Sequence, residues 1–153
     1  MPYLDKQRMR LMNDPNVYKI LLIHNNIKLV ELTRKQFRAD IDKLTICDDS
    51  SQGLDLALKI RPHLIIIDVD SQPLSSFELA ANIRQTEVLE DTPIVFTYSA
   101  KNKNIPILAF TLGASSFLNT EEDLALLVKE SKLLMDVYQF KLLAKKVYKS
   151  DKS

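Results

Sequence analysis

Polar side chains that could carry out chemistry stand at the ends of four apolar runs in this chain. The runs are YKILLI, LIIID, PIVFTY and SSFL, and the polar residues at or just beyond their ends are His24, Asn25, Asp68, Asp70, Tyr98, Ser99 and Thr120. A carboxylate can act as a nucleophile or a metal ligand, an imidazole can carry a proton, and hydroxyl groups can bind the oxygens of an anion. If the runs are neighbouring strands of one sheet, these groups form a single site.

The pattern of apolar residues predicts such a sheet. Continuous runs rich in Ile and Leu, such as 18–23 and 64–68, are typical of strands buried on both faces, and further strands are predicted at 44–47, 93–98 and 115–118. The predicted helices cover 4–12, 28–40, a segment around Leu54–Leu58 that Pro62 ends, a segment that Ser75 or Ser76 caps, 104–112 and 122–149. This alternation predicts a three-layer α/β fold with a doubly wound, five-stranded parallel sheet and an extended C-terminal helix. Such a sheet binds ligands at the carboxyl ends of its strands.

Composition narrows the classes of function. The chain has 153 residues, 46% of them hydrophobic, so we expect one domain at 18–138, an N-terminal extension at 1–17, and a helical extension or linker to an output domain at 139–153. The net charge of +1 argues against a broad nucleic-acid-binding surface. Two glycines exclude a glycine-rich phosphate loop, and one cysteine excludes a disulfide framework. Without a membrane-spanning run or a signal peptide, we expect a cytoplasmic protein that does not contact the membrane.

Four segments resemble the receiver domains of two-component response regulators. The segments are KILLIHNN, RPHLIIIDVDSQPLSSFEL, TPIVFTYSA and GASSFLNT, and the resemblance covers residues 18–138. It implies a flavodoxin-like fold with Asp68 at the position of the aspartate that accepts a phosphoryl group. In the family, an acidic pair after the first strand helps to hold Mg²⁺. A Thr or Ser after the fourth strand and a Lys after the fifth bind the phosphoryl oxygens.

The residues at those helper positions depart from the family pattern. His24 and Asn25 replace the acidic pair, and neither supplies the carboxylate oxygens that Mg²⁺ favours. The hydroxyl position falls on Tyr98 or, with one inserted residue, on Ser99, and Thr120 replaces the lysine. We therefore predict a pseudo-receiver that has lost the magnesium site of the family, holds no cofactor and is not an enzyme.

Asp68 then has two interpretations. We expect a vestigial carboxylate held by backbone amides or by His24, which in its protonated form would partly replace the missing cation; a neutral polar histidine is the alternative. Two ligands are too few for a transition-metal site, although Asp70 would add a carboxylate if the chain curled back. The alternative function is a receiver that a histidine kinase still phosphorylates on Asp68 to control an output domain or partner. A small-ligand or nucleotide-binding module is a third candidate.

Two further patterns predict contacts. Tyr98 and Phe117 are expected to pack, either in one fixed arrangement that makes the surface around the fourth and fifth helices functional or as ordinary core residues. In the last helix, residues Leu133, Val137, Phe140, Ala144 and Val147 follow a seven-residue pattern typical of a docking or coiled-coil helix. This helix could pair with its twin in a homodimer, join an output domain, or pack on its own sheet and fray in its second half. We predict protein partners, with a homodimer among them, and no direct contact with nucleic acid.

Overall fold

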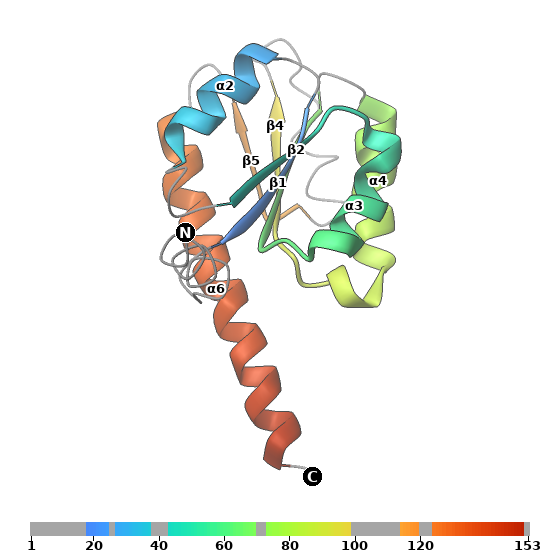
Figure 1. Cartoon of the computed structure of the whole chain (residues 1–153), viewed down its shortest axis with the longest axis vertical. Helices are drawn as coiled ribbons and strands as arrows, with labels where there is room; N and C mark the ends of the chain where they lie inside the picture. The colour runs from blue at the N-terminus through green and yellow to red at the C-terminus, as the bar shows by residue number, and fades with distance from the viewer. Residues whose placement is uncertain are drawn as a thin grey trace, which may run out of the picture.

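The structure, a computed structural model, describes residues 18–24, 27–37, 43–69, 73–98, 114–119 and 124–151. Within these residues, five strands form one sheet in the order β2-β1-β3-β4-β5, and all neighbouring strands are parallel (Figure 1). The strands are β1 (Lys19–Ile23), β2 (Lys43–Cys47), β3 (Leu64–Asp68), β4 (Ile94–Tyr98) and β5 (Ser116–Asn119). The predicted five-stranded parallel sheet is confirmed.

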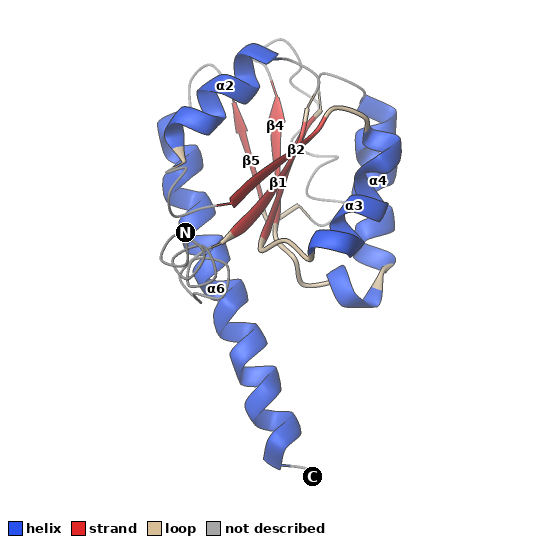
Figure 2. Cartoon of the chain, in the orientation of Figure 1, coloured by secondary structure: helices blue, strands red, loops and turns tan. Residues whose placement is uncertain are grey.

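Helices cover both faces of this sheet. They are α2 (Ile27–Gln36), α3 (Gly53–Ile60), α4 (Pro73–Gln85) and α6 (Leu124–Asp151), with short 3-10 helices η1 (Ser50–Gln52) and η2 (Glu87–Leu89). Figure 2 shows α2 and α6 on one side of the strands and α3 and α4 on the other, so the three-layer arrangement is also confirmed. None of these helices combines the length and the apolar character that crossing a membrane requires. The helices predicted over 4–12 and 104–112 lie outside the described residues.

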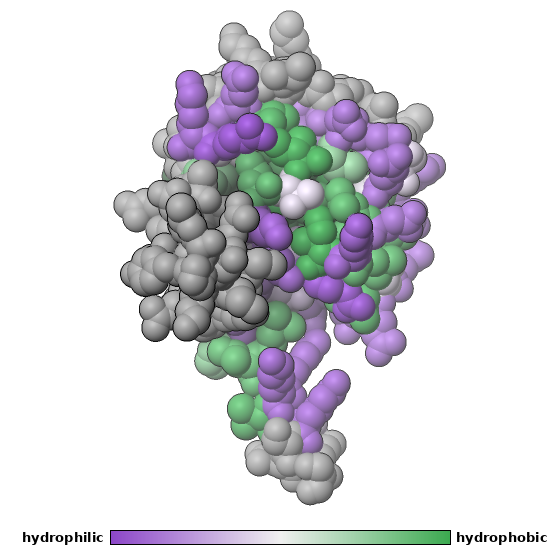
Figure 3. All heavy atoms as spheres, in the orientation of Figure 1, coloured by the Kyte–Doolittle hydropathy of each residue, from purple (hydrophilic) through white to green (hydrophobic). Residues whose placement is uncertain are grey.

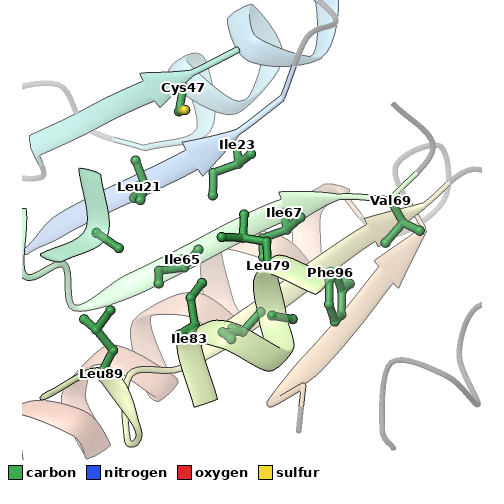
Figure 4. Close-up of a cluster of buried hydrophobic side chains, with 13 residues drawn as sticks. Leu21, Ile23, Cys47, Ile65, Ile67, Val69, Leu79, Ile83, Leu89 and Phe96 are labelled. Atoms are coloured by element: carbon green, nitrogen blue, oxygen red, sulfur yellow. The ribbon is translucent and has the colours of Figure 1, made fainter. Parts of the chain in front are cut away.

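Alternating side chains of the strands build two separate hydrophobic cores. Alternate residues of a strand point to opposite faces, so a continuous apolar run can pack against helices on both sides. The core under α3 and α4 includes Leu21, Ile23, Ile65, Ile67, Leu79, Ile83 and Phe96 (Figure 4). The core under α2 and α6 includes Ile20, Leu22, Leu64, Ile66, Val95, Leu127 and Met135. Both runs that predicted doubly buried strands therefore contribute to both cores.

Three local boundaries differ from, or refine, the predictions. Helix α2 ends at Gln36 rather than at residue 40. Helix α4 begins at Pro73, whose fixed φ suits the first helical turn, so Ser75 and Ser76 lie inside this helix and do not cap it. Before α3, the Asp49 side chain accepts a hydrogen bond from the Ser51 N–H at 2.9 Å and caps η1.

The order of the strands determines where in the sheet the functional site lies. The order reverses between β1 and β3, and in doubly wound sheets the crevice for ligands lies at this point, outside the carboxyl ends of the strands. Ile23 of β1 pairs with Ile67 of β3. The residues that follow them, His24 and Asp68, therefore lie opposite each other. On the other side of β3, Asp68 pairs with Thr97 of β4.

Candidate functional site

Three polar residues of neighbouring strands meet at the carboxyl edge of the sheet. His24 follows β1, Asp68 ends β3, and Thr97 is the fourth residue of β4. The residues two positions earlier on each strand, Leu22, Ile66 and Val95, all belong to the core under α2 and α6. Because side chains alternate along a strand, His24, Asp68 and Thr97 share that face of the sheet.

The Asp68 carboxylate has a side-chain partner on each oxygen. Its Oδ2 lies 3.1 Å from His24 Nε2, and its Oδ1 accepts a hydrogen bond from the Thr97 hydroxyl at 3.1 Å. The three residues are buried, with exposed fractions of 3% for His24, 6% for Asp68 and 3% for Thr97. The predicted proximity of His24 and Asp68 is confirmed.

The backbone around these side chains is itself hydrogen-bonded. The His24 N–H donates to the Cys47 carbonyl at 2.8 Å, and the Val69 N–H donates to the Thr97 carbonyl at 2.9 Å. The Ser76 hydroxyl of α4 donates to the Asp68 carbonyl at 3.3 Å. The site is therefore fixed to the four strands β1 to β4 and to the first turn of α4.

These contacts satisfy a charge that would otherwise be costly to bury. An isolated carboxylate is strongly disfavoured in a low-dielectric interior unless charge pairing and hydrogen bonds compensate it. The His24 Nε2–H can donate to Asp68 from the neutral imidazole or from the imidazolium, and the second form also neutralises the carboxylate charge. The imidazole thus stands next to Asp68 where the family resemblance implies an acidic metal ligand.

Thr97 is the contact that the sequence prediction missed. Counting from Pro93 put the hydroxyl position on Tyr98 or Ser99, but the hydroxyl that donates to Asp68 is that of Thr97. The register pairs Thr97 directly with Asp68, and alternation turns Tyr98 toward the other face, where its ring centroid lies 5.9 Å from that of Phe117. The signal available in the sequence was the position of Thr97, a hydroxyl-bearing residue within the mostly apolar run 93–98. The predicted packing of Tyr98 against Phe117 is confirmed.

Four of the predicted site residues lie outside the described residues. They are Asn25, Asp70, Ser99 and Thr120, and their roles stay predictions. Asn119, the last residue of β5, is described and buried, and it pairs with Tyr98 in the sheet. Among the described residues, no three His, Cys, Asp or Glu side chains gather closely enough to hold a metal ion.

The last group of predicted residues lies on α6. Leu133, Val137, Phe140, Ala144 and Val147 are all exposed on this helix.

Cys47 is buried at the end of β2, where its thiol donates to the Asp49 carbonyl at 3.0 Å. Burial raises the pKa of this thiol, so Cys47 is a packing residue rather than a nucleophile.

The sequence of the chain was compared with those of known proteins and protein families. No protein-family model matches the chain. A probable transcriptional regulator, ycf29 of Pyropia yezoensis, is 23% identical over 106 residues, which are 69% of this chain and 48% of that protein. The transcriptional activator protein PfeR of Pseudomonas aeruginosa is 26% identical over 100 residues, which are 65% of this chain and 32% of that protein. The chain therefore spans about half and about a third of the lengths of these two curated relatives.

Solved structures give the stronger match. A putative response regulator from Chloroflexus aurantiacus J-10-fl aligns with a TM-score of 0.71 and 18% identity, covering 78% of this chain and 98% of that one. The chemotaxis protein CheY4 of Vibrio cholerae aligns with a TM-score of 0.68 and 19% identity, covering 77% and 98%. NtrX from Brucella abortus aligns with a TM-score of 0.75 and 14% identity, covering 90% of this chain and 30% of that one. The chain has the flavodoxin-like fold of response regulator receiver domains, extended by the C-terminal helix α6.

Proposed function

We propose that this chain is a pseudo-receiver, which takes part in signal transduction through contacts with other proteins and is not switched by magnesium-dependent phosphorylation. One observation carries the proposal: both oxygens of the buried Asp68 carboxylate have a side-chain partner at 3.1 Å, His24 on one and Thr97 on the other. The proposal includes no catalytic activity and no bound cofactor.

The geometry around Asp68 supports this proposal. Phosphoryl transfer depends on positioning, because the attacking oxygen must approach the phosphorus in line while a cation neutralises the phosphoryl oxygens. Asp68 is 6% exposed and each of its oxygens already has a side-chain partner, so an incoming phosphoryl group would have to displace His24 or Thr97. We therefore propose that the protein functions with Asp68 unphosphorylated and bound to His24 and Thr97.

The charge next to Asp68 supports it as well. Mg²⁺ prefers oxygen ligands, usually with negative charge, whereas the residue facing Asp68 from β1 is an imidazole. In its protonated form His24 would repel a metal cation, and in its neutral form it presents a nitrogen that such a hard ion disfavours. We therefore propose that the family's magnesium site is absent here.

Signalling would then depend on surfaces rather than on chemistry. The Tyr98 ring packs against Phe117, which supports one fixed arrangement of β4 and β5. Both curated relatives are named as transcriptional regulators and are much longer than the region they share with this chain. An output domain, fused or separate, is therefore one proposed partner, and a second copy of this chain is another.

The second candidate function is a receiver that a histidine kinase still phosphorylates on Asp68. Two observations favour it: Asp68 ends β3 beside the point where the strand order reverses, and a hydroxyl, that of Thr97, lies next to its carboxylate. In this case His24 would act as a removable counterion rather than as a permanent partner.

An NMR titration separates the two functions. The amide spectrum of the chain would be followed during addition of Mg²⁺ and then of beryllofluoride, a phosphoryl mimic, with the Asp68→Asn variant as the matched control. The pseudo-receiver predicts no saturable shifts at His24, Asp68, Thr97 or Asn119. Saturable shifts that disappear in Asp68→Asn would overturn the proposal and establish the phosphorylated receiver.

A further inference from the structure

A row of apolar side chains on α6 faces solvent. Leu133, Phe140 and Val147, spaced seven residues apart, are 65%, 72% and 61% exposed, and Val137 and Ala144 lie between them and are exposed too. These five residues are called the α6 stripe below. The second half of α6 projects beyond the α/β body (Figure 1), and Figure 3 shows apolar and hydrophilic side chains side by side along the projecting part.

The domain uses the opposite side of the same helix. Leu127, Ser131 and Met135 of α6 are buried, and Leu127 and Met135 belong to the core under α2 and α6. Further along, Lys145 Nζ lies 2.6 Å from Asp91 Oδ2 of the loop after η2. With about 3.6 residues per turn, these positions fall on the side of the helix away from the α6 stripe. The body therefore fixes α6 so that the stripe points outward.

The spacing of the stripe is that of a coiled-coil seam. Written as a heptad, Leu133, Phe140 and Val147 occupy position d, and Val137 and Ala144 occupy position a. Glu130, the preceding a position, is used within the domain, where it accepts a hydrogen bond from the Ser116 hydroxyl at 2.6 Å. The seam thus begins at Leu133 and runs toward the end of the helix.

The residues that flank the α6 stripe indicate which partner binds to it. Asp136 falls at position g on one side of the seam, and Lys141 falls at position e on the other side. In a parallel pair, g of one helix faces the following e of its partner, so both symmetry-related contacts would join a carboxylate and an ammonium group. The next such pair is Leu143 with Tyr148, two exposed apolar residues that would extend the buried surface.

We propose that the α6 stripe binds the same stripe of a second copy of this chain, forming a parallel two-stranded coiled coil from Leu133 to Val147. Parallel pairing places the two α/β bodies side by side at one end of the coil. In an antiparallel pair g faces g and e faces e, so Asp136 and Lys141 would not meet. The Tyr18 hydroxyl already donates to Asp136, and a carboxylate has acceptor capacity for a second donor. This dimer does not depend on the chemistry of Asp68.

Sedimentation of the full chain over a concentration series tests the dimer. We expect the mass to rise from the 17.5 kDa monomer to twice that value with increasing concentration. Phe140→Glu, at an exposed position that leaves the fold intact, is expected to remain monomeric, whereas Val88→Glu, the same type of change at an exposed apolar residue of η2, is expected to dimerise normally. A chain that stays monomeric at every concentration, or a dimer unaffected by Phe140→Glu, would overturn the proposal.

Cross-linking and charge exchange test the orientation. Val147→Cys is expected to give a disulfide-linked dimer under oxidation, because identical d positions face each other in a parallel pair, whereas Lys149→Cys on the far side of the helix is not. Lys141→Glu is expected to weaken the dimer, and the double exchange Asp136→Lys with Lys141→Glu to restore it. A dimer in which Val147→Cys fails to cross-link, or in which the double exchange restores nothing, would contradict parallel pairing.

Discussion

His24 Nε2 and Asp68 Oδ2 lie 3.1 Å apart across two adjacent parallel strands, and both residues are buried. The contact follows from the register, since Ile23 and Ile67 pair in the last rung of these strands and the next residues extend the ladder. A buried carboxylate that has lost its partner is much less stable than a buried pair, because its desolvation is no longer compensated. The contribution of each partner to the stability of the fold can therefore be measured.

Removal of His24 is predicted to be the most damaging change in the site. His24→Ala should lower the free energy of unfolding by about 3 kcal/mol, because Asp68 keeps its buried charge without the imidazole. Asp68→Asn should cost only about 1 kcal/mol, because the amide oxygen can accept from His24 while the amide N–H donates to the Thr97 hydroxyl. Denaturant unfolding of both variants and the double variant measures the coupling, and losses that simply add would show that the two residues do not interact.

The Thr97 hydroxyl is predicted to stabilise the carboxylate from the β4 side. Thr97→Val keeps the shape of the side chain and removes the donor to Asp68 Oδ1, so we expect a loss of about 1.5 kcal/mol in the free energy of unfolding. Thr45→Val is the matched control, because Thr45 lies in β2, which β1 separates from β3. The control should change stability by less than about 0.5 kcal/mol, since valine suits a half-buried strand. Equal losses at the two positions would argue against a special role for Thr97.

The sheet could be predicted from the sequence because its signal is local. A run such as Ile65–Ile67 can be buried on both faces only inside a sheet covered by helices on both sides, and each of its residues is fully buried. The approach of His24 to Asp68 could be predicted for the same reason, since both residues end such runs. The partner on β4 could not, because it depends on the register between two strands, which a count of residues from Pro93 does not contain.

The role of α6 shows a second limit of the sequence. Its apolar residues alone do not tell which side packs on the domain and which side is left for a partner. Leu127 and Met135 lie in the core, whereas Leu133 and Phe140 are exposed, and only the position of the helix on the sheet separates these two sets. A seven-residue pattern is compatible with either use of a helix face, so packing has to be known before a partner can be inferred.

Introducing an acidic pair at positions 24 and 25 is predicted to create a binding site for Mg²⁺. In His24→Asp/Asn25→Asp, the carboxylate at position 24 would adjoin Asp68, and the repulsion between these two groups should lower the melting temperature when no cation is present. Mg²⁺ should then raise the melting temperature of this variant, because a ligand that binds only the folded state stabilises it, and leave the wild type unchanged. Thermal unfolding with and without Mg²⁺ measures both effects. Adding Asp68→Asn to the variant should remove most of the Mg²⁺ response, and a wild type that Mg²⁺ stabilises equally would contradict the prediction.

His63 is predicted to make the stability of the fold depend on pH. Its Nδ1 accepts a hydrogen bond from the Lys19 N–H at 3.0 Å, and its ring packs edge-on against Tyr18 and Tyr138 of α6. Burial is the main cause that lowers the pKa of His63 below its ordinary value of 6.5, and the nearby Lys19 ammonium lowers it further. The unfolded chain therefore binds a proton at a higher pH than the folded chain does.

The sign of the effect follows from this difference. Well above pH 6.5 the imidazole is neutral in both states. As the pH falls through 6.5 toward the lower folded pKa, protonation favours the unfolded chain, so the free energy of unfolding decreases. Denaturant unfolding at several pH values should show a steeper decrease for the wild type than for His63→Asn, whose side-chain oxygen can still accept from Lys19. The two proteins differ only at position 63, so the difference between their pH profiles isolates His63. Parallel pH profiles for the two proteins would show that the folded state does not disfavour protonation at this position.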